Sequence, residues 1–399
     1  MADRFPGGVI SKTPPEVVAP VDGEGGSASG VWTLDEQLGL QKAGAWPKKV
    51  LPRELYTWGV NSFGQLGDNS TVGKQVPTQV GLLTDWVQVS SGTNHTVCLK
   101  LNGTLFAWGN NNVGELGIGG SGNSFSSPVQ IGALTNWAQV SVGAVHTACV
   151  KTDGTLWTWG DNAAGRLGLN INPAVDRSSP TQVGALSNWA QVSAGTDNTL
   201  CVTTSGTLFS WGNGAQVGDG TVIDRSSPVQ IGALTNWAVP ACGQTHSLCT
   251  TTNGTLFSWG ANNAGMLGDG TIISKSSPVQ IGALTTWSLP AAGGCSACIT
   301  TEGTLFTWGP GVQTGLNVTT QTSSPVQVGA LTNWAQISVG TTHSHAVKTD
   351  GTLWAWGVNT NGRLGIGNTV NKSSPTQVGA LTNWSNPHAW VIGSAILKG

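Results

Sequence analysis

The chain has 399 residues, only 9% of which are charged, and its formal net charge is −2. Its 58 glycines and 19 tryptophans, with abundant Thr, Ser and Asn, favour short strands joined by tight turns over helices. No apolar stretch approaches the roughly 18 residues that cross a bilayer, and the first residues, MADRFPGGVI, lack the apolar run of a secretory signal. We therefore expect no membrane insertion and no signal peptide.

The first 52 residues differ in character from everything that follows. Residues 1–30 are rich in Pro and Gly and have too little apolar surface to fold alone, so they predict an extended arm. Residues 31–52 predict a short helical anchor and linker, because Thr33 and Glu36 match a capping box and Gly44 suits a helix C-terminus.

The predicted anchor carries four large apolar side chains that need a surface to pack against: Trp32, Leu34, Leu38 and Trp46. Two alternatives remain open for them. In the first, they are partner-anchoring residues that dock the arm onto another protein. In the second, they pack on the rest of the same chain and cover one of its faces.

Beyond the anchor the sequence repeats. The dipeptide Trp-Gly begins at positions 58, 108, 159, 211, 259, 308 and 356, at intervals of 48 to 52 residues. A second tryptophan follows each one at positions 86, 137, 189, 237, 287, 334 and 384. A repeat of this length is typical of an array whose units bury their apolar faces only against their neighbours.

Each unit predicts four short strands. In one unit they are TLFAWG (104–109), PVQIG (128–132) after a Ser-Ser-Pro stop, WAQVSVG (137–143) and HTACVKT (146–152). The Asp153-Gly154 pair that follows is a strong hairpin signal, because Gly tolerates positive φ. Four strands per unit, seven times, predict an all-β fold in which residues 53–399 form a seven-bladed β-propeller.

The two ends of the array predict how the ring closes. The last unit stops at GSAILKG (393–399), where its partner strand is missing, and the opposite end begins with the unpaired strand RELYTWG (53–59). Pairing these strands would leave no exposed edge. The residues expected to make this closure are Leu55, Tyr56, Trp58, Ile396 and Leu397.

Several elements of the unit recur in register: G-x-x-H-(T/S), D-G-T and W-G…G-x-L-G, as in residues 143–169. They resemble the regulator-of-chromosome-condensation repeat over roughly residues 54–398, which implies a seven-bladed propeller. That family includes nucleotide exchange factors for a small nuclear GTPase, so one function implied is an intracellular regulator of a small GTPase. Unit lengths of 48–52 residues leave no room for the wedge-like insertion that such a factor needs.

Two units depart from the G-x-L-G element, at residues 212–220 (GNGAQVGDG) and 309–317 (GPGVQTGLN). These shorter loops are expected to leave one face lower at the fourth and sixth blades. A binding notch there is one interpretation, and loss of the motif without a function is the simpler one.

The sequence predicts no enzyme, no cofactor and no metal site. Beyond residue 54 there are 12 acidic and 11 basic residues, scattered over seven units, with no pair spaced for acid–base chemistry and no basic cluster for nucleic acid. One repeat position holds His95, His146, His246 and His343, for which we expect a structural role in bonding loop backbone groups. His345 and His388 lie off this pattern with no visible partner, and the seven cysteines are expected to be buried, reduced thiols.

The segment SGVWTLDEQLGLQKAGAWP (29–47) resembles a G-x-W-T-L-x-E-Q…G-x-W-P segment of tail-fibre and other virion proteins of tailed bacteriophages. This resemblance implies a non-enzymatic virion protein on a tail, fibre or capsid, made in the host cytoplasm. Its partners would be other virion proteins through residues 1–50 and a host-surface glycan or protein through the propeller. A bacterial surface adhesin or scaffold is a further alternative.

Overall fold

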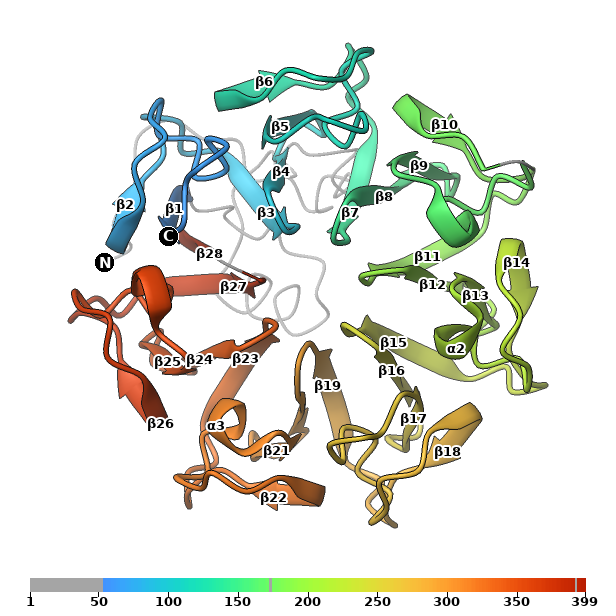
Figure 1. Cartoon of the computed structure of the whole chain (residues 1–399), viewed down its shortest axis with the longest axis vertical. Coiled ribbons are helices and arrows are strands. Elements are labelled where there is room, and N and C mark those ends of the chain that lie inside the picture. The colour runs from blue at the N-terminus through green and yellow to red at the C-terminus, as the bar shows by residue number, and fades with distance from the viewer. Residues whose placement is uncertain (1–52, 172–173, 392) are drawn as a thin grey trace, which may run out of the picture.

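Seven four-stranded antiparallel sheets surround a central axis as the blades of a closed ring (Figure 1). The computed structural model describes residues 53–171, 174–391 and 393–399, so the predicted arm (1–30) and the predicted anchor and linker (31–52) lie outside the described residues. The predicted fold class, a seven-bladed β-propeller closed by its terminal strands, is confirmed.

Blades are numbered here by the order of their Trp-Gly dipeptides, with strands given from the axis outwards. Blade 1 consists of β27 (Trp384–Ala389), β28 (Gly393–Lys398), β1 (Glu54–Gly59) and β2 (Lys74–Gln79). Blade 2 consists of β3 (Trp86–Ser91), β4 (His95–Lys100), β5 (Leu105–Gly109) and β6 (Phe125–Gln130). Blade 3 consists of β7 (Trp137–Val142), β8 (His146–Lys151), β9 (Leu156–Gly160) and β10 (Arg177–Gln182). Blade 4 consists of β11 (Trp189–Ala194), β12 (Asn198–Thr203), β13 (Leu208–Gly212) and β14 (Arg225–Gln230).

The remaining blades repeat this order. Blade 5 consists of β15 (Trp237–Cys242), β16 (His246–Thr251), β17 (Leu256–Gly260) and β18 (Lys275–Gln280). Blade 6 consists of β19 (Trp287–Ala292), β20 (Ser296–Thr300), β21 (Leu305–Gly309) and β22 (Thr322–Gln327). Blade 7 consists of β23 (Trp334–Val339), β24 (His343–Lys348), β25 (Leu353–Gly357) and β26 (Lys372–Gln377). The long loops hold four short helical turns, η1 (Ala163–Gly165), α2 (Gly214–Val217), α3 (Gly311–Thr314) and η2 (Thr360–Gly362).

The sequence unit and the structural blade are out of step by half a blade. A unit counted from one Trp-Gly supplies the two outer strands of one blade and the two inner strands of the next. Blade 1 is therefore built from both ends of the described chain, and β1 pairs with β28 in an unbroken antiparallel register that sets Leu55 opposite Leu397 and Tyr56 opposite Ile396. This offset is what closes the ring.

The outer strands begin earlier than the sequence predicted. Residues 128–132 were expected to follow a Ser-Ser-Pro stop, whereas β6 starts at Phe125 and contains the Ser-Ser-Pro segment. The register between β5 and β6 slips between Ala107 and Gly109, so a bulge takes up the extra residues. Pro is tolerated there because an edge strand needs no N–H donor on its outer side.

The two faces of the ring differ. Successive strands alternate in direction, so the loops after the first and third strands of every blade share one face, called here the long-loop face. The Asx-Gly turns and the Ala-Leu-Thr turns share the opposite, short-turn face, where the Trp137 N–H bonds the Gly103 carbonyl. Gly103 has φ +74°, and a Cβ there would collide with the Thr135 backbone, so this turn requires glycine.

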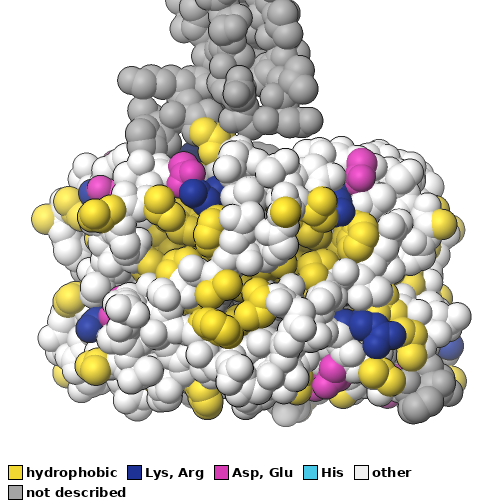
Figure 2. Space-filling view, turned by 90° about the horizontal axis from the view of Figure 1, so that it is seen from above, with side chains coloured by type: hydrophobic (Ala, Val, Ile, Leu, Met, Phe, Trp, Pro, Cys, Tyr) yellow, Lys and Arg dark blue, Asp and Glu magenta, His cyan; other side chains and the backbone are white. Residues whose placement is uncertain are grey.

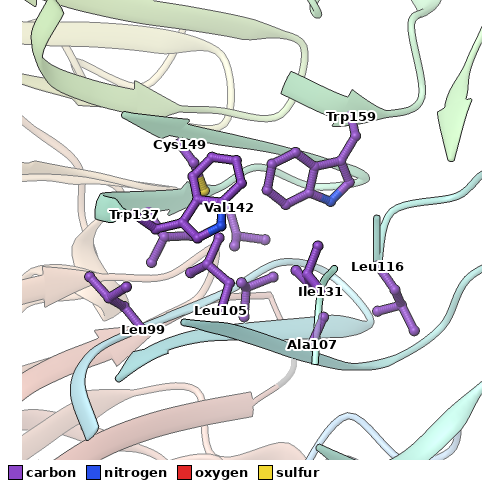
Figure 3. Packing of buried hydrophobic residues seen from close by; sticks show 11 residues of the cluster. Leu99, Leu105, Ala107, Leu116, Ile131, Trp137, Val142, Cys149 and Trp159 are labelled. Atoms are coloured by element: carbon purple, nitrogen blue, oxygen red, sulfur yellow. The ribbon is translucent and has the colours of Figure 1, made fainter. Parts of the chain in front are cut away.

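The hydrophobic core is divided among the seams, the contacts between neighbouring blades. Each of seven buried clusters draws residues from two adjacent blades. In seam 2/3, Leu105 and Ile131 of blade 2 pack against Trp137 and Trp159 of blade 3 (Figure 3). Burying one tryptophan removes about 150–250 Å² from water, a gross stabilisation of about 4–6 kcal/mol, so each blade depends on its neighbours for its core.

Candidate functional site

A hydrogen bond from a Trp-Gly indole crosses every seam. Each of these seven buried indoles donates from Nε1 to the carbonyl of a long-loop residue in the preceding blade, over 2.8–3.0 Å. The accepting residues, in order from blade 1 to blade 7, are Gln65, Glu115, Arg166, Gln216, Met266, Gln313 and Arg363. The W-G and G-x-L-G elements of the repeat are therefore two halves of one contact.

The histidine position completes this contact. In seam 2/3, the Thr147 hydroxyl donates to the same Glu115 carbonyl that Trp159 uses, and His95 Nε2 lies 3.2 Å from that hydroxyl. Because the hydroxyl proton is already committed, we assign the proton to Nε2 of His95, which makes the imidazole the donor. We call this arrangement of imidazole, hydroxyl, carbonyl and indole the seam clasp.

The clasp recurs with substitutions. His146, His246 and His343 reach the hydroxyls of Thr199, Ser296 and Ser394, and Asn198 reaches Ser247 in the place of a histidine. Burial lowers the pKa of His95 to about 3 and that of His246 to about 4, so these imidazoles are neutral. The structural role that we predicted agrees with this geometry, but the imidazoles bond a neighbouring blade's hydroxyl and not loop backbone groups.

The two histidines off the pattern do have partners, contrary to the sequence prediction. His388 Nε2 lies 3.1 Å from the Ser90 hydroxyl, and its Nδ1 accepts from the Ser91 N–H at 3.2 Å. His345 Nδ1 lies 3.4 Å from the Ser394 hydroxyl. These contacts span seams 1/2 and 7/1, which the sequence could not show because the partners lie about 300 and 49 residues away.

The cysteines and carboxylates form no reactive cluster in the part of the chain that the structure describes. All seven cysteines are free, buried thiols, as predicted, and burial raises the pKa of Cys242 and Cys295 to about 12. Within the described ranges, no group of three His, Cys, Asp or Glu side chains could hold a metal ion. Among the described helices, none has the length and apolar character needed to span a bilayer.

The innermost strands surround a central channel with a hollow of about 220 Å³. Side-chain amides and hydroxyls tie neighbouring inner strands together: Gln88 bonds both backbone groups of Val140, and the Val142 N–H donates to Ser90. Three inner strands instead carry proline in the channel wall, at Pro240, Pro290 and Pro387. Polar ties and proline rings therefore both line the channel, with no concentration of charge among its lining residues.

Large aliphatic side chains stand exposed at the tips of the loops on the long-loop face. Blades 4 and 5 each carry an adjacent pair, Val222-Ile223 and Ile272-Ile273, exposed by 55–73%. Single residues occupy the corresponding loops of blades 1, 3 and 7: Val72, Val175 and Val370. We call the residues of blades 4 and 5 the loop-tip surface.

The loop-tip surface rests on rigid loops. In blade 4, Asp219 accepts from the Thr221 N–H and hydroxyl and forms an ion pair with Arg225. In blade 5, Asp269 makes the same two bonds to Thr271, and hydrogen bonds hold the pKa of both Asp carboxyls low despite their burial. Asp219 and Asp269 thus cross-link the two loops internally, next to the exposed aliphatic side chains.

The two divergent loops of blades 4 and 6 each form a helical turn. Residues 214–217 and 311–314 form the single helical turns α2 and α3, and Gln216 and Gln313 still supply the carbonyls of their seam clasps. Beside the second loop, a groove of about 530 Å³ opens on the rim between blades 6 and 7. Figure 2 shows how apolar side chains gather in hollows along another part of the rim.

The residues predicted for ring closure lie at seam 7/1 and seam 1/2. Leu55, Trp58, Ile396 and Leu397 are buried in clusters shared with blades 2 and 7, and Tyr56 packs edge-on against Trp384. A Lys398–Glu54 ion pair of 2.7 Å lies at the end of this strand pair. Trp32, Leu34, Leu38 and Trp46 lie outside the described residues.

Sequence reasoning missed the loop-tip surface. Its signal was present as Thr-Val-Ile and Thr-Ile-Ile before the Ser-Ser-Pro segments of blades 4 and 5. Aliphatic residues between Asp-Gly and Ser-Ser are unusual for an exposed turn, and their spacing alone did not distinguish exposure from burial.

Fold and seams together define a closed seven-bladed propeller. The RCC1-like domain model matches residues 54–395, and the chain belongs to this family. Mouse regulator of chromosome condensation is 35% identical over 170 residues, which are 41% of this chain and 40% of that protein. The Arabidopsis thaliana ultraviolet-B receptor UVR8 is 33% identical over 169 residues, 41% of this chain and 38% of the receptor.

A further relative is the human probable E3 ubiquitin-protein ligase HERC6, 35% identical over 176 residues, 40% of this chain and 16% of the ligase. The chain thus spans less than half of the length of these relatives. Among solved structures, human WBSCR16 superposes with a TM-score of 0.78 at 21% identity, covering 87% of this chain and 98% of that one. Yeast Prp20p, reported with its binding properties to Gsp1p and histones, superposes with a TM-score of 0.76 at 21% identity. The match covers 88% of this chain and 92% of that one.

Proposed function

We propose that this chain is a non-catalytic protein-binding propeller whose contact with its partner is centred on the loop-tip surface. The observation that carries this proposal is the pair of exposed aliphatic side chains on each of two neighbouring, internally bonded loops. Apolar side chains held in water by a rigid backbone gain free energy when a partner covers them. Because the loops are already ordered, binding there costs little conformational entropy.

The comparisons favour a regulatory protein-binding role over a virion role. The relatives named above are eukaryotic regulators and ligases, and Prp20p is reported with its binding to Gsp1p and histones. Regulation of a small GTPase is therefore the second candidate. Release of a fluorescent guanine nucleotide from Gsp1p, accelerated by this chain, would support that candidate.

Attachment to a bacteriophage particle remains a proposal carried by residues 29–47 alone, and a bacterial adhesin or scaffold is the further alternative. The virion proposal places other virion proteins on residues 1–50 and a host-surface glycan or protein on the propeller. Cross-linking in a lysate of the source through Lys12, Lys42, Lys48 and Lys49 tests it. Links to a capsid or tail protein support a virion location, whereas links confined to the chain's own blades argue against an anchoring arm.

The protein-binding proposal is tested by affinity capture from the source lysate with three forms of the full chain. The loop-tip variant replaces Val222, Ile223, Ile272 and Ile273 by serine. The matched control replaces Leu134, Leu234 and Leu284 by serine; these leucines are exposed by 43–46% in the Ala-Leu-Thr turns of the opposite face. We expect a partner that the wild type and the control capture equally and that the loop-tip variant captures at least tenfold less.

Equal capture by the loop-tip variant and the wild type would contradict the proposal. Loss of capture by the control variant instead would place the contact on the short-turn face. Because all seven substitutions are on exposed side chains, each is expected to change stability by less than about 0.5 kcal/mol, and a melting curve of each form checks that folding is intact.

A further inference from the structure

The groove on the rim between blades 6 and 7 has an apolar body and one charged end. It encloses about 530 Å³, within the range of about 300–1,000 Å³ typical of small-molecule sites. Leu316 and Val318 line it toward the long-loop face, Val326 and Pro375 form its sides, and Trp354 and Lys348 lie toward the short-turn face.

The ammonium of Lys348 has no anionic partner among the described residues. Its Nζ lies 3.7 Å from the centre of the Trp354 ring and 4.9 Å from that of Trp334, which are cation–π contacts. The nearby Asp350 carboxylate instead accepts from the Thr352 N–H and hydroxyl at 2.9 and 2.6 Å. The side chain is nearly buried, and desolvation lowers the pKa of Lys348, although Asp350 acts in the opposite direction.

The other seams show that this combination is particular to seam 6/7. Lys100 and Lys398 occupy the same position in seams 1/2 and 7/1, but each forms an ion pair, with Asp85 and Glu54 respectively. Thr203, Thr251 and Thr300 replace the lysine in the three seams from 3/4 to 5/6.

Seam 2/3 has the same lysine and tryptophans but a bulkier residue beside them. Lys151 Nζ lies 3.8 Å from the centre of the Trp157 ring, which matches Lys348 over Trp354. However, Phe125 stands where blade 6 has Thr322, and it packs against the same cluster as Trp157. Thr322 lines the groove of seam 6/7, so a short side chain at this one position leaves that groove open.

The long-loop end of the groove is fixed in place. The Asn317 N–H donates to the Ser373 carbonyl, and the Ser373 hydroxyl donates to the Asn317 side chain, both at 2.8 Å. These two bonds hold the loop that carries Leu316 and Val318 against β26. The groove therefore offers a preformed apolar wall at one end and an unpaired cation at the other.

We propose that the groove between blades 6 and 7 binds an amphipathic monocarboxylate, with its apolar chain along Leu316, Val318 and Pro375 and its carboxylate on Lys348. A carboxylate there supplies the acceptor that the ammonium lacks, and the apolar chain covers exposed hydrophobic surface. The groove shares no residue with the loop-tip surface, so its occupancy does not depend on the proposed protein partner.

The test uses the full chain with octanoate, octan-1-ol and octylammonium as probes, measured by saturation-transfer NMR and isothermal titration. We expect octanoate to bind saturably and at least tenfold more tightly than octylammonium. Lys348→Met should abolish the preference for octanoate over octanol, and Thr322→Phe, which copies the residue of blade 2, should weaken binding of every probe at least tenfold. Lys151→Met is the matched control and should leave octanoate binding unchanged.

If Lys348→Met folds poorly, Lys348→Glu still tests the proposal. This variant should bind octylammonium more tightly than octanoate, and an unfolded protein could not gain such binding. Equal binding of octanoate and octylammonium by the wild type would overturn the proposal. So would undiminished octanoate binding by Thr322→Phe, because the probe would then occupy another part of the surface.

Discussion

The two tryptophans of each unit look alike in sequence, yet they have different roles in the seam. Trp259 donates its indole N–H to the Gln216 carbonyl at 2.9 Å, whereas the Trp237 indole N–H has no acceptor among the described residues. The two rings pack edge-on with centroids 6.5 Å apart, so both fill the same seam. One tryptophan combines packing with a directional bond, and the other contributes packing alone.

This difference predicts the outcome of a pair of substitutions. Trp259→Phe removes the donor and leaves the buried Gln216 carbonyl without its hydrogen bond, which should cost about 1–3 kcal/mol in addition to lost packing. Trp237→Phe removes an N–H that has no acceptor in the described part of the chain, so it should cost only the packing loss. Urea unfolding of both variants measures the difference, and equal destabilisation would refute the role given to the indole bond.

Residue-level sequence reasoning identified the right positions but not their partners. The repeat placed His95, His146, His246 and His343 at one position and predicted a structural role, which follows from their recurrence at a strand start. Their hydroxyl partners lie 50 to 53 residues away, in the next blade. Spacing along the sequence cannot show that the second strand of one blade faces the second strand of the next blade. The seam clasp is therefore visible only in the structure.

At the scale of elements, ring closure depends on a hairpin whose two strands have no covalent connection. β28 supplies a strand to blade 1 and side chains to two seams, since Leu397 belongs to the cluster of seam 1/2 and Ile396 to that of seam 7/1. Both side chains are fully buried. Loss of β28 would leave β1 and β27 without a partner between them.

Deletion of residues 393–399 should therefore destabilise the whole ring, because it removes the β-ladder of blade 1 and two buried aliphatic side chains that are each worth about 2–5 kcal/mol. We expect a single melting transition at a clearly lower temperature, measured by calorimetry. Lys398→Met is the control: it removes the partly exposed ion pair with Glu54 and keeps the strand, so it should cost no more than about 1 kcal/mol. A truncated chain that melts at the wild-type temperature would indicate an open array.

The elements that the sequence predicted well are those with a clear alternation and a glycine turn, such as β7 and β8. The predicted outer strands start a few residues too far along the chain, because Ser-Ser-Pro resembles a strand terminator. In the structure, a bulge lets the edge strand include this segment. The helical turns α2 and α3 carry no periodic signal, since each has only four residues. For the groove of seam 6/7, the sequence suggested only a binding notch at residues 309–317. It could not show the opposite wall, because that wall comes from the following blade.

At the scale of the whole molecule, the histidines make the ring sensitive to acid. Five of the six are fully buried and His388 is partly buried. Desolvation lowers each pKa: to about 3 for His95 and His345, to about 4 for His246 and His388, and below the usual value for His146 and His343. In the unfolded chain the pKa is about 6.5. Below pH 6.5 the unfolded state therefore binds protons that the folded ring excludes, and stability falls as pH falls toward the folded pKa values.

The repeat provides its own control for this effect, because Asn198 occupies the histidine position of blade 4 and donates to Ser247 at 3.1 Å without titrating. His246→Asn should keep an equivalent bond to Ser296 and remove one proton-binding group from the unfolded state. Between pH 8 and pH 5 the wild type should lose about 2 kcal/mol of unfolding free energy through His246 alone, and the variant should lose that much less. Urea unfolding at the two pH values measures both losses. The carboxylates with lowered pKa, such as Asp219 and Asp269, act at more acidic pH. Burial raises the pKa of Glu115, but this carboxyl is present in both proteins and its effect cancels in their comparison. Identical pH dependence of the two proteins would mean that His246 is protonated in the folded ring, and the neutral imidazole of the seam clasp would have to be abandoned.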